Sequence, residues 1–140
     1  MNAKEFLRQY ETASRIASRL EKEYKREQEL IDSIKSALGG DGMPHGSGVS
    51  KTVEDRAIRL VDKSMKWKTA ELDALEKRME VFEIIHKVPG IEGEILIERY
   101  INLKKWEEIC VIIGYSWHGV HQAHRRALNE VQRTLDSKRA

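Results

Sequence analysis

Apolar residues in the first part of the chain recur in alternating steps of four and three. The series starts at Phe6 and is interrupted once, by Glu27. This spacing is that of a heptad seam, the stripe along which one helix packs against another. It predicts one long helix over about residues 3–38 that needs a partner helix. The seam positions are Phe6, Tyr10, Ala13, Ala17, Leu20, Tyr24, Ile31, Ile34 and Leu38.

A second apolar pattern covers about residues 51–87, and its stripe is broader than a pure seam. Between the two patterns lies the glycine-rich segment "GGDGMPHGSGVS", residues 39–50, which predicts a loop that lets the chain reverse. Ser50 is then expected to cap the second helix. Together the two segments predict an antiparallel coiled-coil hairpin. The residues of the second stripe are Val53, Ala57, Ile58, Leu60, Val61, Met65, Leu72, Leu75, Met79, Phe82 and Ile85.

The tripeptide Val88-Pro89-Gly90 ends the second helix, because proline disfavours helix in the preceding residue and glycine frees the chain to turn. Three shorter helices are expected after it. The last two are separated by "GYS", which predicts a helix-turn-helix with Gly114 in the turn and Ser116 as the cap. The three expected helices cover about residues 91–102, 105–113 and 117–136.

The patterns therefore predict an all-α protein of two domains. Residues 1–88 form the helical hairpin, and residues 89–140 form a small helix-turn-helix domain. The composition agrees, because 34% charged and 6% aromatic residues are typical of long helices that turn only one stripe inward.

The final helix has one apolar face and one polar face. At about 100° per residue, Val120, Ala123, Ala127, Val131 and Leu135 share an arc, with Leu128 at its edge. The opposite arc consists of hydrogen-bond donors. The basic face of a helix is often only a solvated surface, but the helix-turn-helix context favours binding to nucleic acid. The donors are His118, His121, Gln122, Arg125, Arg126, Asn129 and Arg133.

The charge and the cysteine content indicate which partners the protein can bind and in which cellular compartment it is expected. Lys and Arg exceed Asp and Glu by 25 to 23, so only local charge can attract a polyanion. The single cysteine, Cys110, cannot form an internal disulfide, and its apolar neighbours indicate a buried thiol in a reducing cytoplasm. The sequence shows no signal peptide or long apolar run, so we expect a cytoplasmic protein without a membrane partner.

Metal binding and catalysis receive little support from the sequence. Histidines at 118, 121 and 124 have a spacing that can share an ion, but His124 falls within the apolar arc and no carboxylate or thiol completes the set. Cys110 belongs to a different helix. We therefore expect no metal, no cofactor and no enzymatic activity. For Trp117 two roles stay open: its ring either packs over the core of the helix-turn-helix or contacts a sugar-phosphate strand.

Residues 97–131, "IERYINLKKWEEICVIIGYSWHGVHQAHRRALNEV", resemble region 4 of bacterial housekeeping-type sigma factors, the helix-turn-helix that reads the promoter −35 element. The complete layout looks like small regulators encoded by phages and prophages of Gram-positive bacteria, some of which activate late genes. The matching residues are Arg99, Tyr100, Glu107, Glu108, Ile109, Gly114, Ser116, Val120, Gln122, Ala127, Leu128 and Val131.

The resemblance implies a non-catalytic, phage-type transcriptional regulator that binds double-stranded DNA. The hairpin would serve in homodimerisation or in holding RNA polymerase. Where sigma factors have Arg, Glu, Arg and Arg, this chain has Trp117, His118, Gly119 and His121. A different DNA sequence, or a sigma-like protein that binds a host protein without reading DNA, is therefore the alternative. The expected DNA-binding residues are Trp117, His118, His121, Gln122, Arg125, Arg126 and Arg133.

Overall fold

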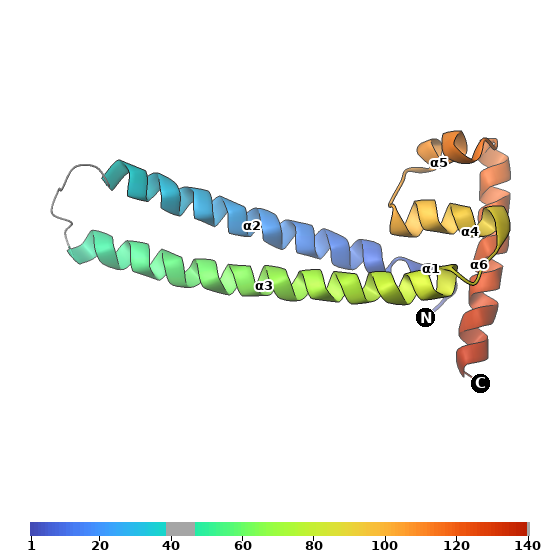
Figure 1. Cartoon of the computed structure of the whole chain (residues 1–140), viewed down its shortest axis with the longest axis horizontal. Coiled ribbons are helices and arrows are strands. Elements are labelled where there is room, and N and C mark those ends of the chain that lie inside the picture. Colours follow the sequence, from blue (N-terminus) through green and yellow to red (C-terminus); the bar gives the residue numbers. More distant parts are fainter. Residues whose placement is uncertain (39–46, 140) are drawn as a thin grey trace. The chain divides into compact units, whose positions relative to one another are not determined.

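A computed structural model shows the predicted all-helical chain and describes residues 1–38 and 47–139, among which there is no strand (Figure 1). By their contacts the residues group into two units: unit 1 is Met1–Ala13 with Asp73–Ala140, and unit 2 is Ser14–Leu72. The elements in chain order are α1 (Ala3–Leu7), α2 (Gln9–Leu38), α3 (Ser47–Ile85), α4 (Gly90–Leu96), the π-helix η1 (Ile97–Ile101), α5 (Trp106–Ile113) and α6 (Trp117–Arg139).

Unit 2 is the antiparallel hairpin that the heptad seam predicted. In it α2 and α3 lie side by side and run in opposite directions (Figure 1). The Tyr24 and Trp67 rings meet across the pair, with their centroids 5.3 Å apart. The seam residues of α2 in this unit are all buried or half-buried: Ala17, Leu20, Tyr24, Ile31, Ile34 and Leu38.

The one break in the seam, Glu27, also faces inward. Its carboxylate lies 3.4 Å from the Arg56 guanidinium and 3.7 Å from the Lys63 ammonium, and its side chain is only 12% exposed. A charged residue at a seam position fixes the alignment of two helices, because any slip leaves a poorly hydrated charge without its partner. The break in the apolar pattern is thus a polar layer across the hairpin.

Helix α3 has two stripes where the sequence interpretation saw one broad stripe. Its inward positions, which begin at Val53, repeat in steps of three and four and include Arg56, Lys63 and Trp67. Much of the apolar set that we had assigned to the hairpin contact is exposed instead, which corrects that assignment. The exposed members are Ile58, Val61, Met65, Leu72, Leu75, Met79 and Phe82.

Two predicted helix boundaries also need correction. Helix α3 begins at Ser47, so Ser50 lies inside the helix and is not its cap. A glycine inside a helix costs only about 1 kcal/mol, which a helix this long can tolerate. The helix predicted over residues 3–38 is interrupted at Arg8, although the bond from Arg8 N–H to the Lys4 carbonyl, 3.1 Å, is kept. Residues 39–46 of the predicted loop lie outside the described residues.

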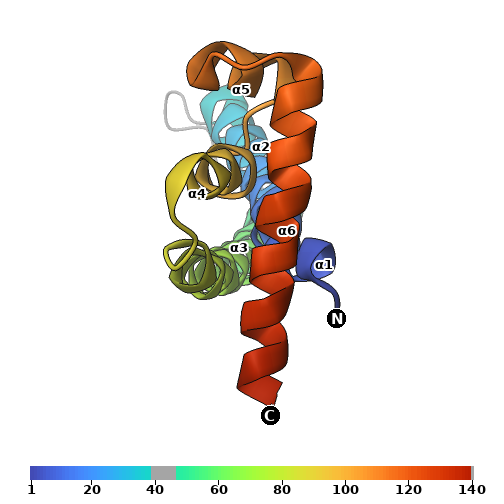
Figure 2. The ribbon, with the colours of Figure 1, turned by 90° about the vertical axis from the view of Figure 1, so that its right-hand side faces the viewer.

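Unit 1 joins both ends of the hairpin segment to the C-terminal helices, which differs from the boundary predicted after residue 88. Leu7 of α1 and Ile85 of α3 are completely buried in the same cluster as Ala127 and Val131 of α6. The Ala3 N–H also donates to Gln132 Oε1 at 2.9 Å. In Figure 2, α4 and α1 lie to either side of α6, and α5 lies by its N-terminal end. Residues 1–13 and 73–88 are therefore part of the core on which α6 rests.

The helix predicted over residues 91–102 consists of two consecutive elements, α4 and η1. Its first turn depends on Gly93, because a Cβ there would lie 2.1 Å from the Val88 carbonyl oxygen. After η1 the chain turns at Leu103, which has a φ of 56°. Arg99 holds this turn by donating to the Lys104 carbonyl at 3.0 Å. The turn directs the chain into α5.

One polar contact lies inside the core of unit 1. The Tyr100 hydroxyl and His124 Nε2 share a hydrogen bond of 2.8 Å, and both residues are buried. Burial lowers the pKa of His124 to about 4, with smaller contributions from Lys4, His121, Arg99 and Arg8. The imidazole is therefore neutral near pH 7. His124 is the packed residue that its place on the apolar arc predicted.

Replacing Leu20 by aspartate should destabilise the hairpin, because the variant places a carboxylate in the half-buried seam. We expect a loss of about 2–4 kcal/mol in the free energy of unfolding, measured by thermal melting in far-UV circular dichroism. Ile16→Asp is the matched control, since Ile16 lies on the same helix and is 45% exposed. Equal melting curves for the two variants would contradict the paired-helix arrangement.

The stability of unit 1 should fall as the pH is lowered from about 6.5 toward 4. Within this window the unfolded chain binds a proton at residue 124 and the folded chain does not, so acid favours unfolding. The shift corresponds to about 3 kcal/mol, lost progressively across the window. His124→Gln should show a weaker pH dependence in chemical denaturation, whereas exposed His118→Gln should behave as the wild type does. A wild-type pH dependence in His124→Gln would refute the assignment.

Candidate nucleic-acid interface

The turn between α5 and α6 has the geometry that the sequence predicted. Gly114 has a φ of 78° and ψ of 24°, a left-handed conformation that favours glycine, and its N–H donates to the Cys110 carbonyl at 2.9 Å. Ser116 Oγ accepts a hydrogen bond from the Gly119 N–H at 3.1 Å. Gly114 in the turn and Ser116 as the cap are thus both confirmed.

The buried face of α6 also agrees with the prediction. Val120, Ala123, Ala127 and Val131 are completely buried, while Leu128 and Leu135 are half-buried against the same core. Val120 and Ala123 form a second cluster with Ile95 of α4 and Ile109 of α5. Since α6 packs along this whole stripe, its opposite face is fixed toward solvent.

The outward arc of α6 exposes most of the predicted donors. The side chains on it are polar and solvent-accessible over more than four helical turns. Such a row of donors can hydrogen-bond phosphate oxygens or the edges of bases. The exposed donors are His118, Gln122, Arg125, Arg126, Asn129 and Arg133.

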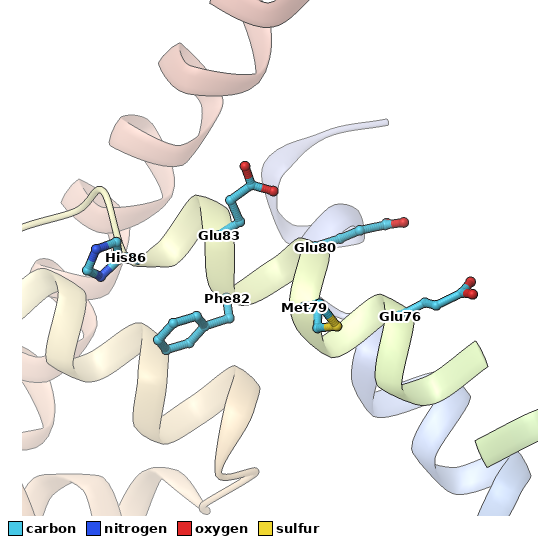
Figure 3. A pocket seen from close by; sticks show the side chains of 6 residues that line it. All are labelled: Glu76, Met79, Glu80, Phe82, Glu83 and His86. Carbon is cyan, nitrogen blue, oxygen red and sulfur yellow. The ribbon is translucent and has the colours of Figure 1, made fainter. Parts of the chain in front are cut away.

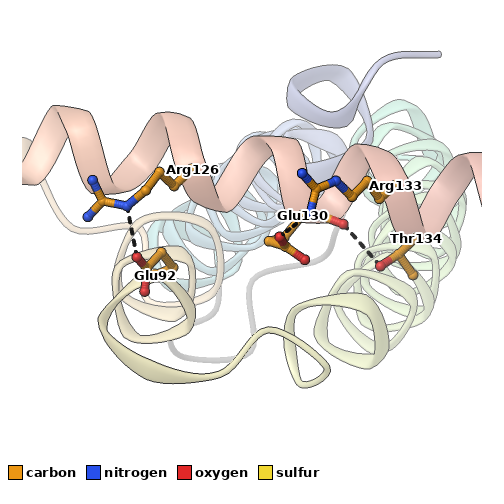
Figure 4. Close-up of polar contacts among 5 residues, drawn as sticks. All are labelled: Glu92, Arg126, Glu130, Arg133 and Thr134. Atoms are coloured by element: carbon orange, nitrogen blue, oxygen red, sulfur yellow. Dashed lines mark hydrogen bonds and ion pairs between the residues drawn. The ribbon is translucent and has the colours of Figure 1, made fainter.

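Two of the three arginines on this arc already have acidic partners (Figure 4). Arg126 Nε donates to Glu92 Oε1 of α4 at 3.0 Å, and Arg133 Nη1 donates to Glu130 Oε1 at 2.7 Å. The pKa of Glu92 is lowered, first by a backbone hydrogen bond and then by the hydrogen bond from Arg126. Both ion pairs are exposed, so each contributes little to stability, but each reduces the positive potential at its arginine.

Arg125 differs from these two arginines. In the described parts of the chain its guanidinium makes no hydrogen bond or ion pair, and the same holds for the Gln122 and His118 side chains. All three lie within the first three turns of α6, the part that a helix-turn-helix presents to the major groove. Arg125 is therefore the arginine of this arc that can meet a phosphate without first losing an intramolecular partner.

His121 occupies a different environment from the one expected. Its ring lies between Trp106 and Trp117, with centroid distances of 4.6 and 4.5 Å, and it is half-buried. Its Nε2 is buried and has no hydrogen-bond partner in the described structure. His121 thus packs against the Trp117 ring and does not belong to the exposed arc. Trp117 itself is 53% exposed, so it partly covers the core and partly faces solvent.

Sequence reasoning missed an apolar patch at the end of α5. Ile112 is 53% exposed, and Val111 beside it is 83% exposed. Tyr115 and Trp117, in and just after the turn that follows α5, are also exposed. The helical period could have predicted this exposure. Trp106, Ile109 and Ile113 share one face of α5, and Val111 and Ile112 fall outside that face.

The part of the chain with described coordinates contains no group of three His, Cys, Asp or Glu side chains placed to hold an ion. Cys110 is half-buried in the apolar cluster around Ile109, and His124 is engaged by Tyr100. None of the described helices combines the length and apolarity that crossing a membrane requires.

Comparisons with known proteins add no family to these observations. The chain matches no protein-family model, and no curated protein or solved structure matches it either. The function must be inferred from the donor arc of α6 and its setting in the helix-turn-helix.

Proposed function

We propose that this protein is a non-catalytic, phage-type transcriptional regulator that binds double-stranded DNA in a sequence-specific manner through α6. The observation that carries the proposal is the row of unpaired donors at the start of α6, directly after a helix-turn-helix turn. A helix in this position enters the major groove with its N-terminal residues against the base edges. The rest of its exposed face then follows the phosphates.

Different residues of the arc serve different purposes in this proposal. Gln122 and His118 approach base edges, because amide and imidazole groups can pair with the donor and acceptor pattern of the major groove. Arg125 contacts a phosphate directly. Arg126 and Arg133 contribute more weakly, since Glu92 and Glu130 share their charge. Trp117, supported by His121, packs its ring against the sugar-phosphate strand at the entrance to the groove.

A second function is favoured by one observation, the apolar patch of Val111, Ile112, Tyr115 and Trp117. Such a patch beside the start of α6 suits a protein partner such as RNA polymerase or another host protein. Filter binding to duplexes from the protein's own upstream region, with a polymerase pull-down in parallel, separates the two functions. Absence of binding to any such duplex at low salt would overturn the DNA proposal in favour of the protein partner.

Arg125→Ala and Gln122→Ala should affect DNA binding in different ways. Arg125→Ala should weaken binding to all duplexes similarly and make the logarithmic salt slope shallower by about one unit, because one phosphate contact is lost. Gln122→Ala should cost about 1–3 kcal/mol at the preferred site and much less on random DNA. Both side chains are exposed, so melting temperatures should not change. Full affinity in both variants would contradict the assignment.

Glu92→Gln should strengthen DNA binding. The variant removes the carboxylate that pairs with Arg126, which frees the guanidinium for a phosphate and removes a nearby negative charge. The logarithmic salt slope measured by fluorescence anisotropy should become steeper. Glu98→Gln is the matched control, because Glu98 of η1 bonds Asn102 at 3.1 Å and makes no ion pair with α6. Weaker binding by Glu92→Gln would show that the pair positions the interface instead of reducing its charge.

A further inference from the structure

Helix α3 has an exposed apolar stripe that the hairpin does not use. Its residues are separated by steps of three and four, the spacing of a coiled-coil seam, with Lys68 at one position of the series. Each is between 43% and 64% exposed. From Ile58 to Phe82 the stripe extends about 36 Å along the helix. We call it the outer stripe: Ile58, Val61, Met65, Leu72, Leu75, Met79 and Phe82.

The outer stripe and the hairpin contact lie on nearly opposite sides of α3. At the coiled-coil period of about 3.5 residues per turn, the middle of the inward seam formed by Leu60, Lys63, Trp67 and Ala70 is about 160° around the helix from the middle of the outer stripe. Contacts to α2, such as the Tyr24–Trp67 pair, therefore leave this side uncovered. Near the end of α3 the stripe forms an open depression lined by Glu76, Met79, Glu80, Phe82, Glu83 and His86 (Figure 3).

We propose that the outer stripe binds the same stripe of a second copy of this chain, with the two α3 helices antiparallel. The stripe is self-complementary about its middle. When residue 70 of one copy lies level with residue 70 of the other, every residue of the outer stripe meets an apolar residue except Leu72, which meets Lys68. In this alignment Ile58 meets Phe82, Val61 meets Met79, Met65 meets Leu75, and Lys68 meets Leu72 of the second copy.

Charge along one flank of the stripe selects the antiparallel orientation. The first half of this flank has Arg59 and Lys66 with Asp62, and the second half has Asp73, Glu76, Glu80 and Glu83, all of them exposed. In the antiparallel alignment the two halves face each other. Arg59 lies between the second copy's Glu80 and Glu83, and Lys66 lies between its Asp73 and Glu76. Such flanking pairs set the orientation of coiled coils.

A parallel dimer would lose these advantages. Lys68 would face Lys68 of the second copy inside the contact, and like charges that are brought together and partly dehydrated oppose association. In a parallel dimer, Arg59 and Lys66 of one copy would lie beside Ala57 and Ser64 of the second copy, which carry no charge. The antiparallel orientation avoids placing Lys68 level with its own counterpart, and it places Arg59 and Lys66 beside acidic residues of the second copy.

The association is tested by sedimentation equilibrium on the full chain across a dilution series. The wild type should be a reversible dimer, and Met65→Asp should be a monomer, because the variant places a carboxylate opposite Leu75. Leu30→Asp is the matched control: Leu30 is an exposed apolar residue of α2 and should leave the dimer intact. Both replacements are at exposed positions, so circular dichroism should match the wild type. A wild type that is monomeric throughout the series would overturn the proposal.

Disulfide trapping tests the orientation in a Cys110→Ala background. Met65→Cys/Leu75→Cys should form a covalent dimer on oxidation, since residues 65 and 75 of different copies are level. The two positions are about 15 Å apart on one helix, too far for a bond within a chain. Neither single cysteine variant should form a covalent dimer. Crosslinking of both single variants would indicate parallel helices and overturn the proposal. These readouts need no DNA, so their failure would leave the proposed function standing.

Discussion

The packing of the small apolar face of α6 against the other helices of unit 1 is the constraint on which the proposed interface depends. Ala127 and Val131 lie in a cluster with Leu7 of α1 and Ile85 of α3, and alanine at this face lets the helices approach closely. Because α6 is held along this stripe, rotation about its own axis is prevented. The donors on the other side are then displayed in one fixed direction. Core packing and the display of Arg125 and Gln122 are two consequences of the same helical period.

The polar contacts of unit 1 fix the alignment of the helices that pack in this way. Tyr100 can bond His124 only when η1 and α6 are correctly aligned, whereas apolar contacts tolerate small slips. The Arg99 guanidinium lies 4.8 Å from the centre of the Trp106 ring and also holds the turn before α5. Trp106 in turn contacts His121, which supports Trp117. A chain of aromatic contacts thus leads from the core to the exposed ring at the start of α6.

Much of this architecture follows from periodicity in the sequence. The seam of α2 could be predicted because each of its positions obeys the heptad spacing, and the buried face of α6 follows from the period of 3.6. The broad stripe of α3 was harder to interpret from the sequence, because two heptad seams on one helix together resemble a single wide apolar face. The contacts of Arg56, Lys63 and Trp67 with α2 separate the inner seam from the outer one.

The interface was predicted less completely, for physical reasons that concern single residues. Glu130 lies three residues before Arg133, so that ion pair could have been read from the sequence. Glu92 lies on another helix, and its contact with Arg126 depends on how α4 packs against α6. His121 lies at the boundary of the arc, where the neighbouring tryptophans decide its burial. The role of residues 73–88 in the core of unit 1 required tertiary contacts between segments distant in sequence.

The two proposals constrain each other through symmetry. An antiparallel pair of α3 helices has a two-fold axis perpendicular to the helices, so both copies contribute the same surface to the contact. A symmetric pair of DNA-binding units recognises a site whose two halves are related by the same operation. Among the described residues, Arg125 is the one arginine of the α6 arc without an ion-pair partner, and the whole chain has a net charge of only +2. In the proposed dimer, two copies on one duplex would double the phosphate contacts, and the second α6 would bind at the high effective concentration that the dimer provides. A weakly charged protein could in this way occupy a DNA site that one copy alone would hold poorly.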